Sequence, residues 1–266
     1  MLHPSGLITL LTDFGDRDWF VASMKGVILT INPHATIVDL NHQIPSHAIE
    51  EGAYVLKSCY RYFPVGTIHL AVVDPGVGSR RRPLIVKSSR YFFVAPDNGL
   101  LTHIFAQEQD VEVREIENKQ YYLESEGRTF DGRDLFAPAA AWLTRRHAFS
   151  SYGQVCGEYS AFPIAVPRWE QMALVGEVEY VDRFGNLITN LTISHVNEVQ
   201  EVAKRLHPLI RIAGHLIDGL VGSYAEGDAD SPHALINSDG QLEIFFKQAR
   251  ASTRLKIGAH EAVTLS

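Results

Sequence analysis

An apolar stretch leads directly into charged residues in IHLAVVDPGVGSRRR, which covers residues 68–82. The unbroken apolar run 70–73 ends at Asp74, and a run of this kind predicts a strand buried on both faces. The Pro-Gly-Val-Gly that follows predicts a sharp turn, after which the arginines at 80–82 come close to Asp74. A carboxylate held beside a guanidinium group at a strand end can bind a polar ligand or take part in acid–base chemistry.

Two further aspartates occupy comparable places. Asp13 follows the apolar run 7–12, and Asp131 begins a Gly-containing turn that leads into an Ala-rich segment of helical character. Ligands of open α/β sheets bind at the carboxyl ends of the strands, so we expect Asp13, Asp74 and Asp131 to share one polar cleft. Aspartate is also common at strand ends and helix N-termini, so Asp131 or Asp134 could simply cap the helix that follows.

Other signatures of chemistry are weak or missing in the sequence. The Gly-Val-Gly at 76–78 lacks the third glycine of a dinucleotide-binding loop, and neither a Walker A motif nor GxSxG occurs. The twelve histidines show no HExxH or similar metal-ligand spacing, although a carboxylate-only Mg²⁺ site stays open. Cys59 and Cys156 have no CxxC spacing and are expected to be packing residues in a reducing compartment.

The elements that must position these side chains fall into two patterns. Up to about residue 160, strand-like apolar runs alternate with segments of helical spacing. For residues 1–160 we therefore predict an α/β domain whose central, mostly parallel sheet is covered by helices. Residues 161–171 contain two prolines and predict a linker. Residues 172–266 are mainly strand-like pieces between turns, which predicts a smaller all-β, barrel-like domain.

Composition restricts the class of protein. The chain has 266 residues, 45% of them hydrophobic and 21% charged, which is ordinary for a globular protein. Its net charge of −7 lacks the basic footprint of nucleic-acid binding. The first residues do not follow a signal-peptide pattern, and no apolar run is long enough to cross a bilayer. We expect a cytoplasmic protein with neither nucleic-acid nor membrane partners.

Six separated motifs occur in order: LLTDFG, VVDPGVGSRRR, APDNGLL, TFDGRDLFAPAAA, VDRFGNLITN and LINSDGQLEI. Together they resemble the S-adenosylmethionine hydroxide adenosyltransferases, which are hydrolases related to the S-adenosylmethionine-dependent fluorinase and chlorinase. The resemblance implies an α/β N-terminal domain, a β-barrel-like C-terminal domain and a homotrimer with active sites between subunits. The reaction it implies is attack of water or hydroxide on the 5′ carbon of S-adenosylmethionine, giving adenosine and methionine without a metal or redox cofactor.

The resemblance also implies roles for individual residues. The implied catalytic group is Asp74, Arg81 and Asp131, the last of which stands where the family usually has His. The implied substrate contacts are Asp13 to the ribose hydroxyls, Asp182 and Asn186 to the methionine amine and adenine, Tyr224 by stacking on the base, and Ser238 to the methionine carboxylate. Residues 246–248 depart from the family's usual adenine-contacting stretch and are candidate contacts.

Two alternative functions stay open. A halogenase of the same fold would have Tyr at position 74 and an insertion before APDNG, and this chain has neither, although Gly132 matches the chlorinase pattern. Two carboxylates beside the nucleophile would also repel a halide ion. A non-catalytic binder of S-adenosylmethionine or adenosine is favoured by Asp131 in place of His. The presence of Asp74 and Arg81 counts against a binder, which needs no water-activating pair.

Overall fold

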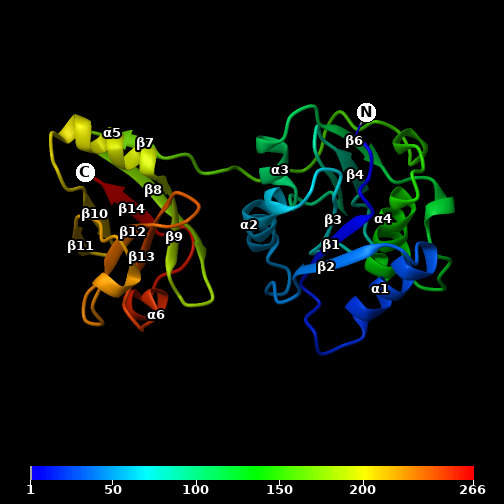
Figure 1. Cartoon of the computed structure of the whole chain (residues 1–266), viewed down its shortest axis with the longest axis horizontal. Coiled ribbons are helices and arrows are strands. Elements are labelled where there is room, and N and C mark those ends of the chain that lie inside the picture. The colour runs from blue at the N-terminus through cyan, green and yellow to red at the C-terminus, as the bar shows by residue number, and fades with distance from the viewer. Residues whose placement is uncertain (1) are drawn as a thin grey trace. The chain divides into compact units, whose positions relative to one another are not determined.

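Two compact units make up the computed structural model, which describes residues 2–266 (Figure 1). The first unit extends to Pro163, and the second runs from Ile164 to Ser266. The segment 161–171, expected to be a linker, contains a short strand, β7 (Arg168–Glu170), which pairs with β8 (Ala173–Val181). None of the described helices has the length and apolar character needed to cross a membrane.

A six-stranded sheet in the order β2-β1-β3-β5-β4-β6 forms the centre of the first unit. Its strands are β1 (Leu7–Thr12), β2 (Thr36–Asn41), β3 (Ile68–Val72), β4 (Pro83–Lys87), β5 (Phe92–Pro96) and β6 (Glu112–Glu115). Strand β1 is parallel to β2 and β3, and β3 is parallel to β5, whereas β4 is antiparallel to β5 and β6. The sheet is therefore mixed, with three of its five strand pairs parallel. The turn 88–91 is too short for the crossover that a parallel β4–β5 pair would need.

Alternate residues of the buried strands face opposite sides of this sheet. The helices of this unit are α1 (Phe20–Ile31), α2 (Ile49–Cys59), α3 (Thr102–Gln107) and α4 (Ala137–Thr144). Ile8 and Leu10 pack in a core with α1 and α4, and Leu11 packs in a second core with α2 and α3. Short helical turns are η1 (Tyr60–Tyr62), η2 (Lys119–Tyr121), η4 (Phe149–Ser151) and the π-helical η3 (Gly132–Phe136), which leads into α4. These cores hold the ends of β1 and β3 in place.

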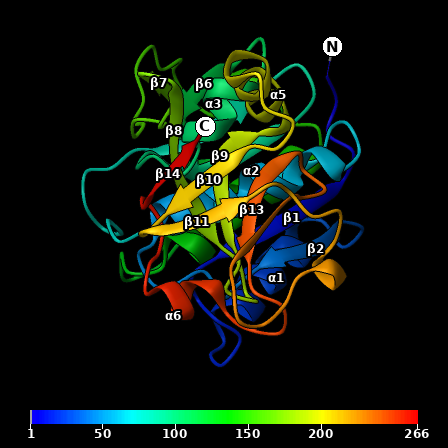
Figure 2. The same ribbon diagram turned by 90° about the vertical axis from the view of Figure 1, so that its left-hand side faces the viewer.

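The second unit is one antiparallel, barrel-like sheet in the order β11-β10-β14-β8-β9-β13-β12, with β7 beside β8 (Figure 2). The remaining strands are β9 (Leu187–Thr192), β10 (Leu209–Ile212), β11 (His215–Asp218), β12 (His233–Ile236), β13 (Gln241–Phe245) and β14 (Ala262–Leu265). The helices are α5 (Ile193–Ala203), η5 (Tyr224–Glu226) and α6 (Ala251–Leu255). Strand β8 pairs with β14 through residues 174–177 and with β9 through 178–181, so it joins the two parts of the sheet.

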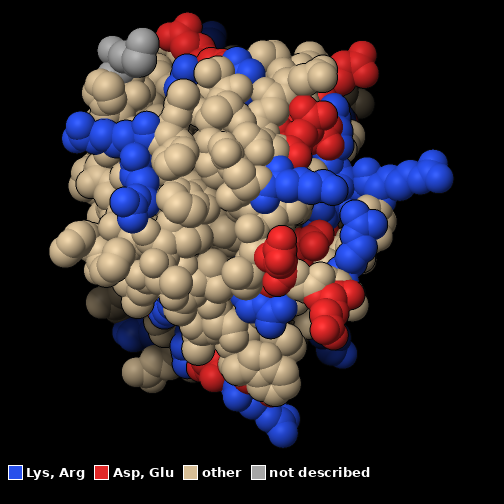
Figure 3. All heavy atoms as spheres, turned by 90° about the vertical axis from the view of Figure 1, so that its right-hand side faces the viewer, with Lys and Arg blue, Asp and Glu red and all other residues tan. Residues whose placement is uncertain are grey.

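Charged side chains of both signs are interspersed on the face of the molecule drawn in Figure 3. They lie around a broad area of residues other than Lys, Arg, Asp and Glu. This face therefore presents a mixed charge pattern rather than a field of one sign.

A histidine is fully buried in the middle of the first sheet. His69 of β3 is 0% exposed, its Nδ1 lies 2.8 Å from Thr9 Oγ1, and its Nε2 has no hydrogen-bond partner among the described residues. The rings of Tyr60, Tyr91 and Phe93 pack around it, and the Phe93 ring stacks on it with 5.2 Å between centroids. Burial lowers the pKa of His69 from 6.5 to about 3, because the imidazolium would lose its hydration.

We expect His69 to make the free energy of unfolding fall as the pH drops below about 6.5. The unfolded chain takes up this proton near pH 6.5, whereas native His69 stays neutral down to about pH 3. Between these two pH values the free energy of unfolding therefore falls by ~1.4 kcal/mol for each unit by which the pH is lowered. Denaturant unfolding should show that the free energy of unfolding of His69→Phe rises relative to that of wild type as the pH falls from about 7 to 4. A difference that does not change with pH would contradict this prediction.

Candidate functional site

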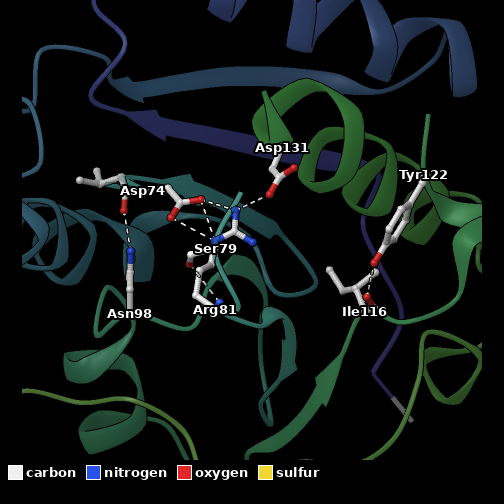
Figure 4. A network of polar contacts seen from close by, with 8 residues as sticks. Asp74, Ser79, Arg81, Asn98, Ile116, Tyr122 and Asp131 are labelled. Atoms are coloured by element: carbon white, nitrogen blue, oxygen red, sulfur yellow. Dashed lines mark hydrogen bonds and ion pairs between the residues drawn. The ribbon is translucent and has the colours of Figure 1, made fainter. Parts of the chain in front are cut away.

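A buried ion pair lies at the carboxyl end of β3. The Asp74 side chain is only 4% exposed. Arg81 Nε donates to its Oδ2 at 2.8 Å and to its Oδ1 at 3.0 Å, and Arg81 Nη2 also donates to Oδ2 (Figure 4). A guanidinium group that contacts both oxygens fixes the plane of the carboxylate as well as its position. The structure thus brings together the two charged residues that the spacing of the loop predicted to be close.

The same guanidinium binds a second carboxylate. Arg81 Nη2 donates to Asp131 Oδ2 at 2.5 Å, and the Asp131 side chain is 20% exposed. Asp131 precedes η3 but makes no side-chain capping hydrogen bond, and its own φ and ψ (−59° and −24°) are helical. A capping residue normally has extended backbone angles, so Asp131 is badly placed to cap. The alternative candidate, Asp134, pairs instead with Arg133 Nε at 2.6 Å. The predicted caps are therefore wrong, and Asp131 faces Arg81.

Contacts from two directions hold the loop between β3 and β4. The Arg81 N–H donates to Ser79 Oγ at 3.2 Å, which closes the loop beside the ion pair. Asn98 Nδ2, in the turn after β5, donates to the Val73 carbonyl at 2.8 Å (Figure 4). Because Val73 immediately precedes Asp74, Asn98 fixes the backbone from which the carboxylate projects.

Arg81 and Asp131 line a groove of about 740 Å³ within the first unit. Gly78 lies on the same groove with φ +76°, and a Cβ there would come within 2.9 Å of the Arg128 carbonyl. Only glycine allows this close approach in a left-handed conformation. The ion pair is thus accessible from the groove while Asp74 itself is almost fully covered.

The charges of this group do not cancel. Burial lowers the pKa of Arg81, but the ion pairs with Asp74 and Asp131 raise it by more, so the guanidinium stays charged. One guanidinium cation then pairs with two carboxylates, Asp74 and Asp131, and an excess of negative charge remains. An excess of hydrogen-bond acceptors can orient a water molecule and take a proton from it. Within residues 2–266, no set of three or more His, Cys, Asp or Glu is arranged to hold a metal ion.

Asp13 lies at the same edge of the sheet. The parallel register places Thr12 of β1 opposite Val72 of β3, so Asp13 and Asp74 both follow the ends of neighbouring strands. Asp13 Oδ2 accepts the His47 N–H at 3.0 Å, rather than joining the Arg81 group directly. Its place at this edge is the one that the apolar run 7–12 predicted.

The remaining predicted contacts belong to the second unit. Asp182 and Asn186, in the turn between β8 and β9, and Tyr224 of η5 line a pocket of about 730 Å³, together with residues 246–248. Asp182 accepts the Asn186 N–H at 2.8 Å and its side-chain amide at 3.1 Å, so the two side chains hold each other. Ser238 is exposed in the turn between β12 and β13 and lies outside the lining of this pocket.

Both units match family models over most of their length. Residues 8–153 match the SAM hydroxide adenosyltransferase N-terminal domain, and residues 176–264 match the C-terminal domain of the same family. The chain belongs to the SAM hydroxide adenosyltransferase family.

Individual relatives agree with this assignment. The chain is 33% identical to the (R)-S-adenosyl-L-methionine hydrolase of Methanocaldococcus jannaschii, over 94% of this chain and 92% of the relative. It is 34% identical to the protein of that name from Thermus thermophilus, over 96% and 97%. A fluorinase from an Actinoplanes species is 26% identical, over 98% and 97%. An uncharacterized conserved protein of Thermotoga maritima has a similar structure, with a TM-score of 0.88, 30% identity and coverage of 97% and 99%.

Three polar residues that contact the predicted site residues or the adjoining backbone were not identified from the sequence. Ser79 and Asn98 lie in motifs noted above, but spacing alone gives no reason to link either residue to Asp74. The third is Glu243 of β13, which is 2% exposed and accepts the Tyr224 hydroxyl at 2.6 Å. A signal for Glu243 was available, because it is a charged residue inside the apolar run LEIFF.

Proposed function

We propose that this protein hydrolyses S-adenosylmethionine to adenosine and methionine. The observation that carries the proposal is the Asp74–Arg81–Asp131 group, found in a chain of the SAM hydroxide adenosyltransferase family. The relatives named (R)-S-adenosyl-L-methionine hydrolase, which match this chain over nearly its whole length, support it. We further propose that no metal or redox cofactor takes part, since the chemistry needs none.

The proposed reaction depends on the nucleophile. The oxygen of water attacks the 5′ carbon, the bond from that carbon to sulfur breaks, and its electron pair goes to sulfur. The sulfonium leaves as a neutral thioether, so no general acid is required. Water must be aligned with the breaking bond and must lose a proton. Asp74 and Asp131 are the proposed acceptors of that proton, and Arg81 orients both carboxylates.

The substrate contacts are proposals of the same kind. Asp13 would hold the ribose hydroxyls. Asp182 and Asn186 would hold the methionine amine and adenine, Tyr224 would stack on the base, and Ser238 would bind the methionine carboxylate. These groups belong to different units of the chain. We propose a homotrimer in which neighbouring subunits complete each site, as the resemblance to the family implies. We also propose a cytoplasmic location, which suits two free cysteines.

One incubation tests the reaction. S-adenosylmethionine is incubated with the protein in ¹⁸O-labelled water and EDTA, and the products are separated and identified by mass spectrometry. We expect methionine and adenosine, with one ¹⁸O in the adenosine. Unchanged substrate combined with binding detected by calorimetry would contradict hydrolysis and favour a non-catalytic binder.

The fluorinase relative keeps a halogenase as the second candidate. The excess negative charge of the Asp74–Arg81–Asp131 group opposes it, because a halide would have to approach two carboxylates. Repeating the incubation at high chloride or fluoride separates the two reactions. Detection of a 5′-halo-5′-deoxyadenosine would favour the halogenase.

We expect Asp13→Ala to raise KM by roughly 10- to 100-fold while kcat stays close to wild type. A charge-assisted hydrogen bond contributes about 1.5–3 kcal/mol, and a ribose contact is made equally in the ground and transition states. Steady-state kinetics measures both constants, and the melting temperature reports any loosening caused by the lost His47 contact. A reduced kcat at unchanged KM would rule out the proposed role of Asp13.

A further inference from the structure

A buried glutamate connects the segments that carry the proposed contacts of the second unit. Glu243 Oε1 accepts the Tyr224 hydroxyl at 2.6 Å, and its Oε2 accepts Asn237 Nδ2 at 3.3 Å. These two partners come from η5 and from the turn between β12 and β13. Glu243 thus links two separate segments, although it lies outside the lining of the pocket. The Asn186 amide, which donates to Asp182 Oδ2 at 3.1 Å, lies near enough to lower the pKa of Glu243.

Glu243 is held more rigidly than its partners. It lies in β13, where it is opposite Leu235 of β12 on one side and Ile188 of β9 on the other. A residue paired on both sides within a sheet has little freedom, whereas turns depend on added contacts. Glu243 in β13 therefore fixes the positions of its partners, rather than being positioned by them.

The contact with Glu243 determines what Tyr224 can offer a ligand. Its hydroxyl is occupied by the Glu243 carboxylate, and the Phe245 ring packs against its ring at 84°, with 5.0 Å between centroids. Burial and Glu243 raise the pKa of Tyr224, so the hydroxyl keeps its proton and remains the donor. The residue is nevertheless 47% exposed on the pocket. The ring face of Tyr224 therefore remains available to a ligand, and a fixed aromatic face is suited to a flat aromatic ligand.

A carboxylate at this position is costly to folding. Burial raises the pKa of Glu243, and nearby Asp182 raises it further, while the hydrogen bonds from Tyr224 and Asn237 oppose the shift only in part. Its neighbours in β13, including Leu242 and Ile244, are apolar and equally buried. An apolar residue at 243 would fill the site at less cost, so stability alone does not account for a glutamate there.

We propose that Glu243 is a positioning residue, which holds the Tyr224 ring in the orientation that receives the adenine part of the substrate. This inference rests on the proposed function, because it assumes that the pocket binds an adenosyl group. Glu243 itself makes no contact with the reacting atoms in this proposal. Its loss should therefore weaken binding while leaving the chemical step intact.

The test uses adenosine as the probe, with calorimetry for its Kd and steady-state kinetics for S-adenosylmethionine. Glu243→Gln keeps the size but places an amide donor opposite other donors, and we expect roughly 10-fold weaker adenosine binding and a similar rise in KM. Turnover at saturating substrate should change less than about twofold. Tyr224→Phe keeps the ring and removes only the anchored hydroxyl, so it should give a comparable loss. The double variant should be no weaker than Glu243→Gln alone, because both changes remove one contact.

Thr189→Val is the matched control. It removes a buried hydrogen bond of the same sheet, from Thr189 Oγ1 to the Leu242 carbonyl at 2.8 Å, without touching the pocket. It should lower the melting temperature and leave the adenosine Kd unchanged.

The outcomes separate the two proposals. Wild-type affinity in Tyr224→Phe would overturn the positioning role, even if Glu243→Gln failed to fold. Additive losses in the double variant would also overturn it, because two independent contacts would then be involved. A wild-type protein that neither binds adenosine nor consumes S-adenosylmethionine would instead contradict the proposed function, and the inference with it.

Discussion

Replacing Asp74 with Asn should lower kcat for S-adenosylmethionine hydrolysis by roughly 10²–10⁴-fold, the usual contribution of a positioned base. The amide keeps the shape of the side chain but turns an acceptor into a donor opposite the Arg81 guanidinium. Arg81 would then be left with Asp131 as its anionic partner. The excess negative charge that can accept a proton from water disappears at the same time. Because Asp74 is proposed to act on the nucleophile, KM should change little.

The chain provides a close control for this variant. Asp97 is 5% exposed at its side chain and accepts from Arg82 Nε at 2.9 Å, so it is a second buried carboxylate paired with an arginine, here the adjacent and more exposed Arg82. Asp97→Asn should cost stability in the same way as Asp74→Asn while kcat stays near wild type. Initial rates at saturating substrate and melting temperatures on both variants give the comparison. Equal losses of kcat in the two variants would mean that Asp74 acts only through stability.

Local sequence patterns predicted the parts of the site that depend on a single strand end. The apolar runs before Asp13 and Asp74 correctly marked two buried strands, and the parallel register of β1 and β3 follows from the alternation of strands and helices. The short loop after Asp74 required an arginine nearby, but spacing could not say which of the three turns inward. The structure directs Arg81 to Asp74 and Arg82 to Asp97, a choice that depends on the turn after β5.

Features that depend on distant segments could not be derived from local patterns. The contact of Asp131 with Arg81 joins residues 50 positions apart. The resemblance implied that both belong to one catalytic group, whereas the local pattern also allowed Asp131 to be a helix cap. The proposed role of Glu243 depends on its hydrogen bonds to side chains of two other segments, above all to Tyr224. In each case the deciding partner lies far away in the sequence.

We expect Asp131→Ala to lower kcat by roughly 10²-fold and to change the melting temperature only slightly. Its side chain makes no capping hydrogen bond, so the stability loss of about 0.5–2 kcal/mol typical of a lost cap should not appear. Asp134→Ala is the control, since Asp134 lies three residues further along and pairs with Arg133 rather than Arg81. That variant should keep wild-type kcat. A stable, fully active Asp131→Ala would remove Asp131 from the catalytic group.

Asp131→His should keep or raise turnover relative to wild type and change its dependence on pH. A free imidazole titrates near pH 6.5, so kcat of the His variant should fall as the pH drops below about 6.5. The imidazole can accept a proton only when neutral, and its cationic form would also repel Arg81. Profiles of kcat against pH for wild type and Asp131→His, measured between about pH 4 and 9, decide the question. Identical profiles would mean that the group at position 131 does not titrate in the rate-limiting step, and Asp74 would then be the remaining proton acceptor.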